Sequence, residues 1–346
     1  MTVGSDQFLA QAVVAWQVRH GRHDLPWQNT RDPYRVWLSE IMLQQTQVVT
    51  VLDYFARFLS RFPDVGALAN ASLDDVLSLW SGLGYYSRAR NMHRCAQEVM
   101  SHHAGFFPAT AQQLQGLPGI GPSTAAAVAS LCFSERVAIL DGNVKRVLTR
   151  YLGFDADLAQ AKNERVLWQE ATRLLPDEEL GRNMPRYTQG MMDLGATLCT
   201  TKNPDCPSCP VQARCVAYAN GNPLAFPVKS RKLKRSAQSL WLLWARSEDG
   251  ALWLSQRPTP GVWAGLYCFA LFDSYQALQA AVAKDGCAGL VDIPAFKHVL
   301  THKDLYLHPV QVVMPRSSRP EASGDWFEPL QWQRLGLPAP ISKLLR

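Results

Sequence analysis

Apolar residues recur every three or four positions over most of the first 220 residues, which is the spacing of one face of an α-helix. Turn residues separate the periodic stretches. This part of the chain is therefore predicted to be mostly helical. The clearest predicted helices are Leu73–Trp80, Arg88–His102 and Ala111–Leu117, the last preceded by the capping-box pair Thr110 and Gln113.

One apolar face extends through "SEIMLQQTQV" and predicts a single long helix from about residue 37 to residue 55. Glu40, Gln44 and Gln47 form a polar stripe along the border of that face. Partial desolvation at such a border raises a glutamate's pKa above its usual ~4.3, which suits a general acid. The alternative is a half-exposed glutamate that pairs with Arg35. The residues of the apolar face are Trp37, Ile41, Val48, Leu52 and Phe55.

The pattern changes after residue 220. Residues 221–237 contain prolines and the basic run "KSRKLKRS", which predicts a solvated linker that could also touch phosphate. Residues 238–346 read as a smaller α+β domain. "SLWLLWAR" and "ALWLSQR" flank "SEDG" as a β-hairpin, "LYLHPVQVVMP" reads as a further strand, and Tyr275–Val282 reads as a helix.

Composition places the chain among soluble, multidomain proteins. It has 346 residues, 47% of them hydrophobic, which is enough for two or three cores. No apolar run reaches the ~20 residues that cross a bilayer, and residues 1–7 lack a signal pattern. We expect a cytoplasmic protein, associated with the nucleoid if it is bacterial. The net charge of +6 fits a polyanionic partner without requiring one.

Four of the eight cysteines fall between residues 199 and 215, in the pattern C-x6-C-x2-C-x5-C. Thiolates this close together can converge on one metal centre. The single close pair with flanking cysteines favours an iron–sulfur cluster, and zinc stays open as the alternative. The four are Cys199, Cys206, Cys209 and Cys215.

"LQGLPGIGPSTAAAVASL" predicts two helices joined by a tight turn. Gly119 and Gly121 allow backbone conformations that other residues avoid, and small alanines let the helices pack closely. The second helix then presents its N-terminal N–H groups as an anion site. This is a helix–hairpin–helix that would bind DNA phosphates without reading sequence. Downstream, Asp141 is either an ordinary N-cap or a carboxylate placed beside a positive charge forming on a sugar.

The ordered set of a border glutamate, a glycine-rich hairpin, an aspartate and four cysteines resembles the helix–hairpin–helix DNA glycosylases that carry a [4Fe-4S] cluster. Three stretches are similar to the MutY-type adenine DNA glycosylases: "LPWQNTRDPYRVWLSEIMLQQTQV", "GLGYYSRARN" and "ILDGNVKRVL". The resemblance covers residues 8–220 and continues more weakly to the C-terminus. It implies an all-α catalytic domain over 1–220, with the cluster loop at 199–215, and a Nudix-like α+β domain over 238–346.

The resemblance also implies an activity: removal of adenine from 8-oxoguanine:adenine or G:A mispairs in double-stranded DNA, during base excision repair. Glu40 would protonate adenine N7 and so improve the leaving group. Asp141 would stabilise the oxocarbenium-like sugar, with Asn143 positioning the site. Arg22 and Trp27 match positions near the adenine pocket, and the four cysteines would hold one [4Fe-4S] cluster.

Further roles follow from the same resemblance. Gln44 and Tyr85 match residues that enter the base stack around the lesion. Ser123, in "LPGIGPSTA", occupies the position where related strand-cutting enzymes carry a lysine nucleophile, so we expect base removal with little strand cleavage. Lys145 lies close enough in sequence to trap an abasic sugar inefficiently. With Gly119 and Gly121, Ser123 and Lys145 complete the predicted DNA-binding set.

The C-terminal domain resembles the Nudix-like domain that MutY proteins use to recognise 8-oxoguanine. It lacks the clustered glutamates that hold magnesium in active Nudix hydrolases, so nucleotide hydrolysis is not expected. Where the family often has Phe-Ser-His, this chain has "LTH". Thr301 and His302 are the predicted lesion contacts, and Leu300 puts the strength of the 8-oxoguanine preference in question.

Two other functions remain open at this point. A pyrimidine-damage glycosylase/lyase would have the same helical fold, although Ser123 and the appended domain disfavour it. A non-catalytic DNA-binding protein would use the metal only as a scaffold. We expect a monomer, and no motif identifies a protein partner.

Overall fold

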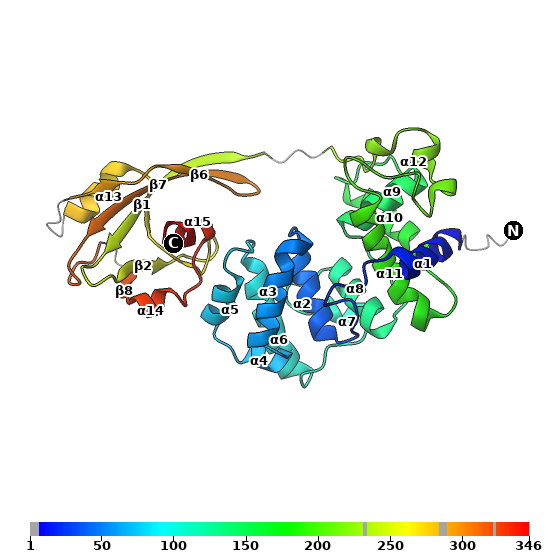
Figure 1. Ribbon diagram of the computed structural model, residues 1–346, viewed down its shortest axis with the longest axis horizontal. Coiled ribbons are helices and arrows are strands. Elements are labelled where there is room, and N and C mark those ends of the chain that lie inside the picture. The colour runs from blue at the N-terminus through cyan, green and yellow to red at the C-terminus, as the bar shows by residue number, and fades with distance from the viewer. Residues whose placement is uncertain (1–6, 231–233, 284–288, 321–322, 346) are drawn as a thin grey trace. The chain divides into compact units, whose positions relative to one another are not determined.

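The computed structural model describes residues 7–230, 234–283, 289–320 and 323–345. It divides into two compact units, shown with their helices and strands in Figure 1. The first unit takes residues 1–55, 64–66 and 94–231. The second takes residues 56–63, 67–93 and 232–346. The basic residues Arg231 and Lys232 of the predicted linker lie outside the described residues, as does Cys287.

The described chain is helical up to residue 225, as the apolar spacing predicts. The helices in this part are α1 (Phe8–His20), α2 (Pro33–Leu43), α3 (Val48–Arg61), α4 (Val65–Ala69), α5 (Leu73–Trp80), α6 (Ser87–His102), α7 (Ala111–Leu114), α8 (Pro122–Phe133), α9 (Gly142–Leu152), α10 (Ala161–Arg173), α11 (Leu180–Thr197), η1 (Gln212–Arg214), α12 (Val216–Ala219) and η2 (Pro223–Ala225).

The single long helix predicted over residues 37–55 is wrong. The structure ends α2 at Leu43 and begins α3 at Val48. Between them Gln45 adopts a left-handed backbone with a φ of 57°, and a residue in that conformation ends an α-helix. The stripe of Glu40, Gln44 and Gln47 is therefore not one helical face, because Gln44 and Gln47 belong to the connecting loop.

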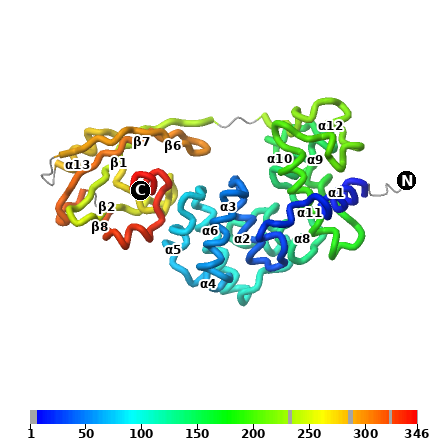
Figure 2. The backbone as a smooth tube through the Cα atoms, in the orientation of Figure 1, coloured from blue at the N-terminus to red at the C-terminus, as the bar shows by residue number. Residues whose placement is uncertain are grey.

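Helix α11 is the central element of the first unit. It packs against α1, α8 and α9, as the backbone tube in Figure 2 also shows. Its buried residues include Met184, Tyr187, Met191 and Leu194. At Gly190 the approach of α1 is so close that a Cβ atom would lie 2.8 Å from the Val13 side chain. Apolar burial and this close helix contact thus fix the relative positions of the helices that carry the loops of the first unit.

The remaining elements form the α+β region of the second unit, and the described residues build one eight-stranded sheet. The β1–β2 hairpin is confirmed, with Arg246 opposite Leu252. The longest pairing is parallel, between β1 and β7. The elements are β1 (Ser236–Arg246), β2 (Leu252–Gln256), β3 (Tyr267–Cys268), β4 (Ala270–Phe272), α13 (Tyr275–Ala283), β5 (Val291–Asp292), β6 (Phe296–Val299), β7 (Lys303–Val313), β8 (Gly324–Phe327), α14 (Pro329–Trp332) and α15 (Ala339–Leu344).

Helix α13 covers part of this sheet. Its buried residues Leu278 and Val282 join a core cluster with Leu243, Trp253 and Val310 from the strands. The predicted helix over Tyr275–Val282 is thereby confirmed to within one residue.

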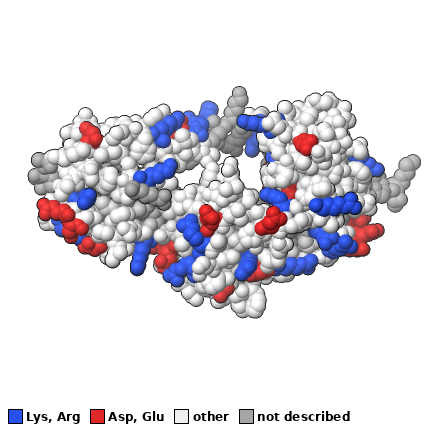
Figure 3. Space-filling view, viewed as in Figure 1, with Lys and Arg blue, Asp and Glu red and all other residues white. Residues whose placement is uncertain are grey.

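The surface carries mixed charge. On the face shown in Figure 3, lysine and arginine side chains alternate with acidic ones and do not merge into one patch. Across the described residues, every helix is too short or too polar to span a bilayer.

Candidate active site

A cavity of about 640 Å³ in the first unit brings together residues that are far apart in the sequence. Its wall is built from the loop after α1, the end of α2, the α2–α3 loop, α8, the start of α9, and α11. Five of the residues singled out from the sequence as catalytic or base-binding line it: Arg22, Trp27, Glu40, Asp141 and Asn143.

Glu40 lies in the last turn of α2 and is half-buried at the cavity wall. Burial, with the negative charge of Asp141 as the second cause, raises its pKa to about 7. At pH 7 the protonated fraction of this carboxyl is therefore about one half, against about 0.3% for an ordinary glutamate. The alternative pairing with Arg35 is not seen, because Arg35 lies beside Asp32 at 3.7 Å.

Asp141 is the N-cap of α9, and its Oδ1 accepts a hydrogen bond from the Val144 N–H at 2.7 Å. Burial raises its pKa, while the N–H groups of Val144 and Asn143 and the positive charges of Arg146 and Lys145 oppose that rise. The N-cap and the catalytic interpretations are thus compatible, since one carboxylate oxygen caps the helix and the side chain still faces the cavity.

Asn143 is held by two neighbours. The Nη2 of Arg146 donates to Asn143 Oδ1 at 2.8 Å and to the Gly195 carbonyl at 2.6 Å. Helix α11 passes so close that a Cβ atom on Gly195 would lie 2.6 Å from the Asn143 Cβ. A real Cβ atom does not tolerate that distance, so the glycine permits the approach.

Arg22 forms an ion pair with the fully buried Asp193, with 2.6 Å between Nη2 and Oδ1. Its Nε also donates to Asp193 Oδ1 at 2.7 Å, and its backbone N–H donates to Oδ2 at 3.1 Å. Gln189 donates its Nε2 to the same Oδ1 at 3.1 Å. Beside them the buried Trp27 meets Phe55 edge-on, with 5.2 Å between ring centroids. One carboxylate therefore fixes two polar side chains next to an aromatic wall.

Comparison with known proteins gives this geometry its context. Residues 38–173 match the family model described as "HhH-GPD superfamily base excision DNA repair protein", and residues 241–346 match a NUDIX domain. A protein of Buchnera aphidicola subsp. Acyrthosiphon pisum called adenine DNA glycosylase is 36% identical over 344 residues, which cover 97% of this chain and 96% of the relative. This chain belongs to the adenine DNA glycosylase family. The helix–hairpin–helix and Nudix-like fold classes expected from the sequence are confirmed.

Some other members of the adenine DNA glycosylase family align over a smaller share of the chain. The Mus musculus member is 43% identical over 215 residues, which are 60% of this chain and 41% of that protein. Among solved structures, a thermostable thymine-DNA glycosylase superposes with a TM-score of 0.53 at 26% identity, and covers 61% of this chain and 95% of its own. The helical scaffold is thus shared with glycosylases that have other base preferences.

The predicted hairpin joins α7 to α8. Gly119 has a φ of 77°, which requires glycine. Gly121, the N-cap of α8, has a φ of −81°, so the expectation that it also needs glycine's freedom is wrong. Ser123 lines the cavity and its Oγ accepts a hydrogen bond from the Leu140 N–H at 2.8 Å. Gln44 donates to the Thr124 hydroxyl at 3.3 Å. Both side chains therefore lie at the hairpin side of the cavity.

Lys145 does not line the cavity. Its Nζ forms an ion pair with Glu164 Oε1 at 2.5 Å. The lysine predicted to trap an abasic sugar is thereby engaged by an acid on α10.

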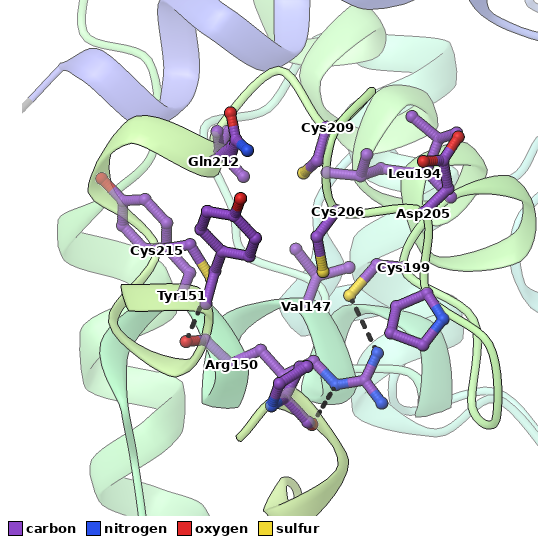
Figure 4. Close-up of a pocket in the computed structure, with 15 residues that line it drawn as sticks. Val147, Arg150, Tyr151, Leu194, Cys199, Asp205, Cys206, Cys209, Gln212 and Cys215 are labelled. Carbon is purple, nitrogen blue, oxygen red and sulfur yellow. Dashed lines mark hydrogen bonds between the residues drawn. The ribbon is translucent and has the colours of Figure 1, made fainter. Parts of the chain in front are cut away.

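Cys199, Cys206, Cys209 and Cys215 line one small cavity with apolar neighbours such as Val147. In Figure 4 their sulfur atoms face this shared space. Burial, with the neighbouring cysteines adding to it, raises the pKa of Cys209 to about 12. In the described part of the chain, no three His, Cys, Asp or Glu side chains lie close enough together to hold a single metal ion.

Arg150, on α9, supports the cysteine loop from below in the view of Figure 4. Its Nη1 donates to the Cys199 sulfur at 3.3 Å and to the Thr200 carbonyl at 2.7 Å. Its Nε donates to the Pro223 carbonyl at 2.8 Å. The helix that begins at Asp141 therefore also anchors the loop.

In the second unit, the predicted lesion contacts lie together. The Tyr85 hydroxyl and the Thr301 Oγ1 are 2.6 Å apart. Tyr85 has a φ of 49°, an uncommon left-handed backbone for a bulky residue. Thr301 and His302 are exposed. The roles assigned to these residues stay predictions, although the structure brings Tyr85 and Thr301 into contact.

Sequence reasoning missed three residues of the site: Arg146, Gln189 and Asp193. Of these three, only Asp193 has a sequence feature that could have identified it. It lies in "MMDLGA", an acid among apolar and small residues of a helix, and a buried acid requires a partner. That partner, Arg22, is 171 positions away, so sequence spacing could not identify it.

Proposed function

We propose that this chain removes adenine from mispairs with 8-oxoguanine or guanine in double-stranded DNA by hydrolysing the N-glycosidic bond. Membership of the family supports the reaction. The observation that carries the proposal is the shared cavity, where Glu40 with a pKa of about 7 faces Asp141. Two carboxyl groups whose environments differ can serve as acid and as charge stabiliser in one reaction.

Glu40 acts as the general acid. Protonation at adenine N7 turns the base into a neutral leaving group as the bond to the sugar breaks. Proton transfer of this kind contributes about 10²–10⁴ to a rate. A carboxyl that is half protonated at pH 7 is acidic enough to donate its proton, and a large fraction of it carries that proton.

Asp141 remains ionised beside the sugar. Departure of the base leaves positive charge on C1′ and the ring oxygen, and a fixed carboxylate stabilises it in a site of low dielectric. Asn143, clamped by Arg146, holds the entrance of α9 in place. A water molecule then attacks C1′, and the products are free adenine and an abasic site.

The reaction stops at the abasic site. Ser123 has no amine, and its hydroxyl already accepts the Leu140 N–H, so no Schiff base forms there. Lys145 is paired with Glu164 and is outside the cavity. We therefore propose base removal with little strand cleavage.

The adenine is held by Trp27, Arg22 and Gln189. The indole supplies an aromatic wall for a flipped base. Gln189 supplies an amide for the base edge, while Arg22 keeps its guanidinium charge balanced by Asp193. A neutral purine, and not an anion, suits this combination.

DNA contacts come from the backbone of the hairpin around Gly119 and Gly121, with Gln44 and Tyr85 entering the base stack. A glycine at 121 leaves open space at its Cβ position, which lets a phosphate approach the α8 N-terminus. Thr301 and His302 contact the lesion opposite adenine, with the Tyr85 hydroxyl positioning Thr301.

The four cysteines would hold one [4Fe-4S] cluster. Four thiolates could also hold a zinc ion, which stays the alternative. The convergence of the four cysteines on one small, largely apolar cavity supports a metal centre there. The four thiolates would bind the irons of the cluster, and that ligation would cross-link residues 199–215. The Arg150 hydrogen bond to Cys199 suits an anionic sulfur.

A base-release assay tests the function. Purified protein is incubated with duplexes that contain 8-oxoguanine:A, G:A, G:T or an oxidised pyrimidine, and each product is analysed with and without alkali. Adenine loss from the first two, with strand breaks only after alkali, is expected. Cleavage of the oxidised pyrimidine duplex without alkali would assign a pyrimidine glycosylase/lyase instead. Iron analysis and visible absorbance decide between cluster and zinc.

A further inference from the structure

A second cavity of about 380 Å³ adjoins the active-site cavity in the same unit. The active-site cavity is called the front cavity below, and the second one the rear cavity. Its rim carries exposed residues such as His23, Asn29 and Arg31, and its floor is buried Gln17 and Val36. The cavity therefore opens to solvent. Volumes of about 300–1,000 Å³ hold drug-sized ligands, so a single purine base fits this space.

Three residues line both cavities: Arg22, Trp27 and Gln189. They form the partition between the two spaces. The two polar side chains of the partition share one partner, because the Asp193 carboxylate binds both the Arg22 guanidinium and the Gln189 amide. Both are long side chains with several rotatable bonds. Arg22 is fixed by the buried ion pair, so the movable part of the partition is the Gln189 side chain.

The second cavity is equipped for a neutral heterocycle. Gln28 lines this cavity, and its covered amide atoms have no hydrogen-bond partner, so a rotation of the side chain would turn an unpaired donor and acceptor towards a base edge. Trp27 offers an aromatic wall. Two arginines of the lining already have partners, because Arg22 pairs with Asp193 and Arg31 donates to the Gly181 carbonyl at 2.9 Å.

The reaction creates a need for such a space. The hairpin and the α2–α3 loop border the front cavity, where the DNA strand enters. Bond cleavage leaves the DNA phosphates unchanged, so their contacts keep the abasic strand in that opening. Free adenine is then enclosed between the strand and the partition.

We propose that the second cavity is the exit route for the excised adenine. The base leaves through the partition when Gln189 swings away from the Trp27 ring while Arg22 stays paired with Asp193, rests in the rear cavity beside Gln28, and escapes over the exposed rim. Adenine release is thereby separated from release of the abasic DNA. This inference rests on the proposed base removal.

The test fills the rear cavity with a bulky side chain and leaves the residues that line the front cavity unchanged. Val18, on α1, is 45% exposed and lines the rear cavity but not the front one. The full-length protein with Val18→Trp is compared with Val14→Trp, a matched indole one turn earlier. Val14 and Val18 both line a third cavity, but only Val18 lines the rear one, so Val14→Trp controls for any effect of filling the third cavity. Duplex with radiolabelled adenine opposite 8-oxoguanine is used in single turnover. Acid quenching measures total bond cleavage, and rapid filtration measures adenine that has left the protein.

Val18→Trp should cleave the bond at the wild-type rate and release adenine on the order of tenfold more slowly. Val14→Trp should match the wild type in both. Entry of free labelled adenine into the complex with abasic DNA should slow by the same factor in Val18→Trp. The exit route is overturned if Val18→Trp releases and takes up adenine at wild-type rates, or if inorganic phosphate binds the rear cavity and adenine does not. Absence of bond cleavage in the wild type would refute the proposed function and not the route.

Discussion

Replacing Glu40 with Gln tests the general acid most directly, because glutamine has nearly the same shape as glutamate but cannot ionise or donate an acid proton. The pKa of Glu40 is about 7 against an ordinary 4.5. At about 1.4 kcal/mol for each tenfold change, ionising this carboxyl costs about 3 kcal/mol more in the folded chain than in the unfolded chain. The side chain borders an open cavity, so solvent screening makes this an upper limit.

The sign follows from proton binding. Between pH 4.5 and 7 the folded chain holds a proton at Glu40 that the unfolded chain has lost, so stability falls as pH rises through this window. Glu40→Gln should therefore unfold at the same denaturant concentration as wild type at pH 4.5. At pH 8 it should be more stable by up to about 3 kcal/mol. Its rate of base release should fall by about 10²–10⁴, with DNA binding retained.

Urea titrations at pH 4.5 and pH 8, paired with single-turnover base release, measure both effects. Glu248→Gln removes an exposed charge and serves as the control, with no change expected in either. Equal stability gains at both pH values would show that Glu40 does not titrate between them. A Glu40→Gln rate within threefold of wild type, about 0.7 kcal/mol, would remove the general-acid assignment.

Other expectations concern pH, packing, the buried ion pair, the cluster and lesion choice. The wild-type rate of base release should decline as pH rises through about 7, since only protonated Glu40 donates; a flat profile from pH 6 to 8.5 contradicts this. Gly195→Ala should displace Asn143 and lower the rate in single turnover, with stability reduced by about 1–3 kcal/mol in urea. Asp193→Asn should cost about 3–5 kcal/mol by the same measurement, because it leaves the Arg22 charge without its partner. Cys206→Ser should lower the iron content, read by metal analysis. Thr301→Ala should narrow the rate ratio between 8-oxoguanine:A and G:A duplexes, and an unchanged ratio excludes its lesion contact.

Local chemistry made several parts of this molecule predictable. Asp141 reads as an N-cap from its place before a helical run, and the structure has that cap. The β1–β2 hairpin follows from two apolar runs around a four-residue turn. The break between α2 and α3 was missed because "QQTQ" contains neither glycine nor proline, and the left-handed Gln45 has no local sequence signal. The parallel β1–β7 pairing and the Arg22–Asp193 ion pair join distant residues, which spacing along one chain does not encode.

The missed break supports the proposal that the two carboxyl groups have different roles. Because α2 ends at Leu43, Glu40 lies in its last turn, where the partial negative charge of a helix C-terminus disfavours a second negative charge. Asp141 lies at the opposite kind of helix end. As the N-cap of α9 it receives N–H groups and the partial positive charge that favour ionisation. Burial raises the pKa of both carboxyl groups, and the charges of the two helix ends have opposite signs. An uninterrupted helix through residue 55 would have removed the C-terminus next to Glu40, and with it a negative partial charge that adds to the effects of burial and of Asp141.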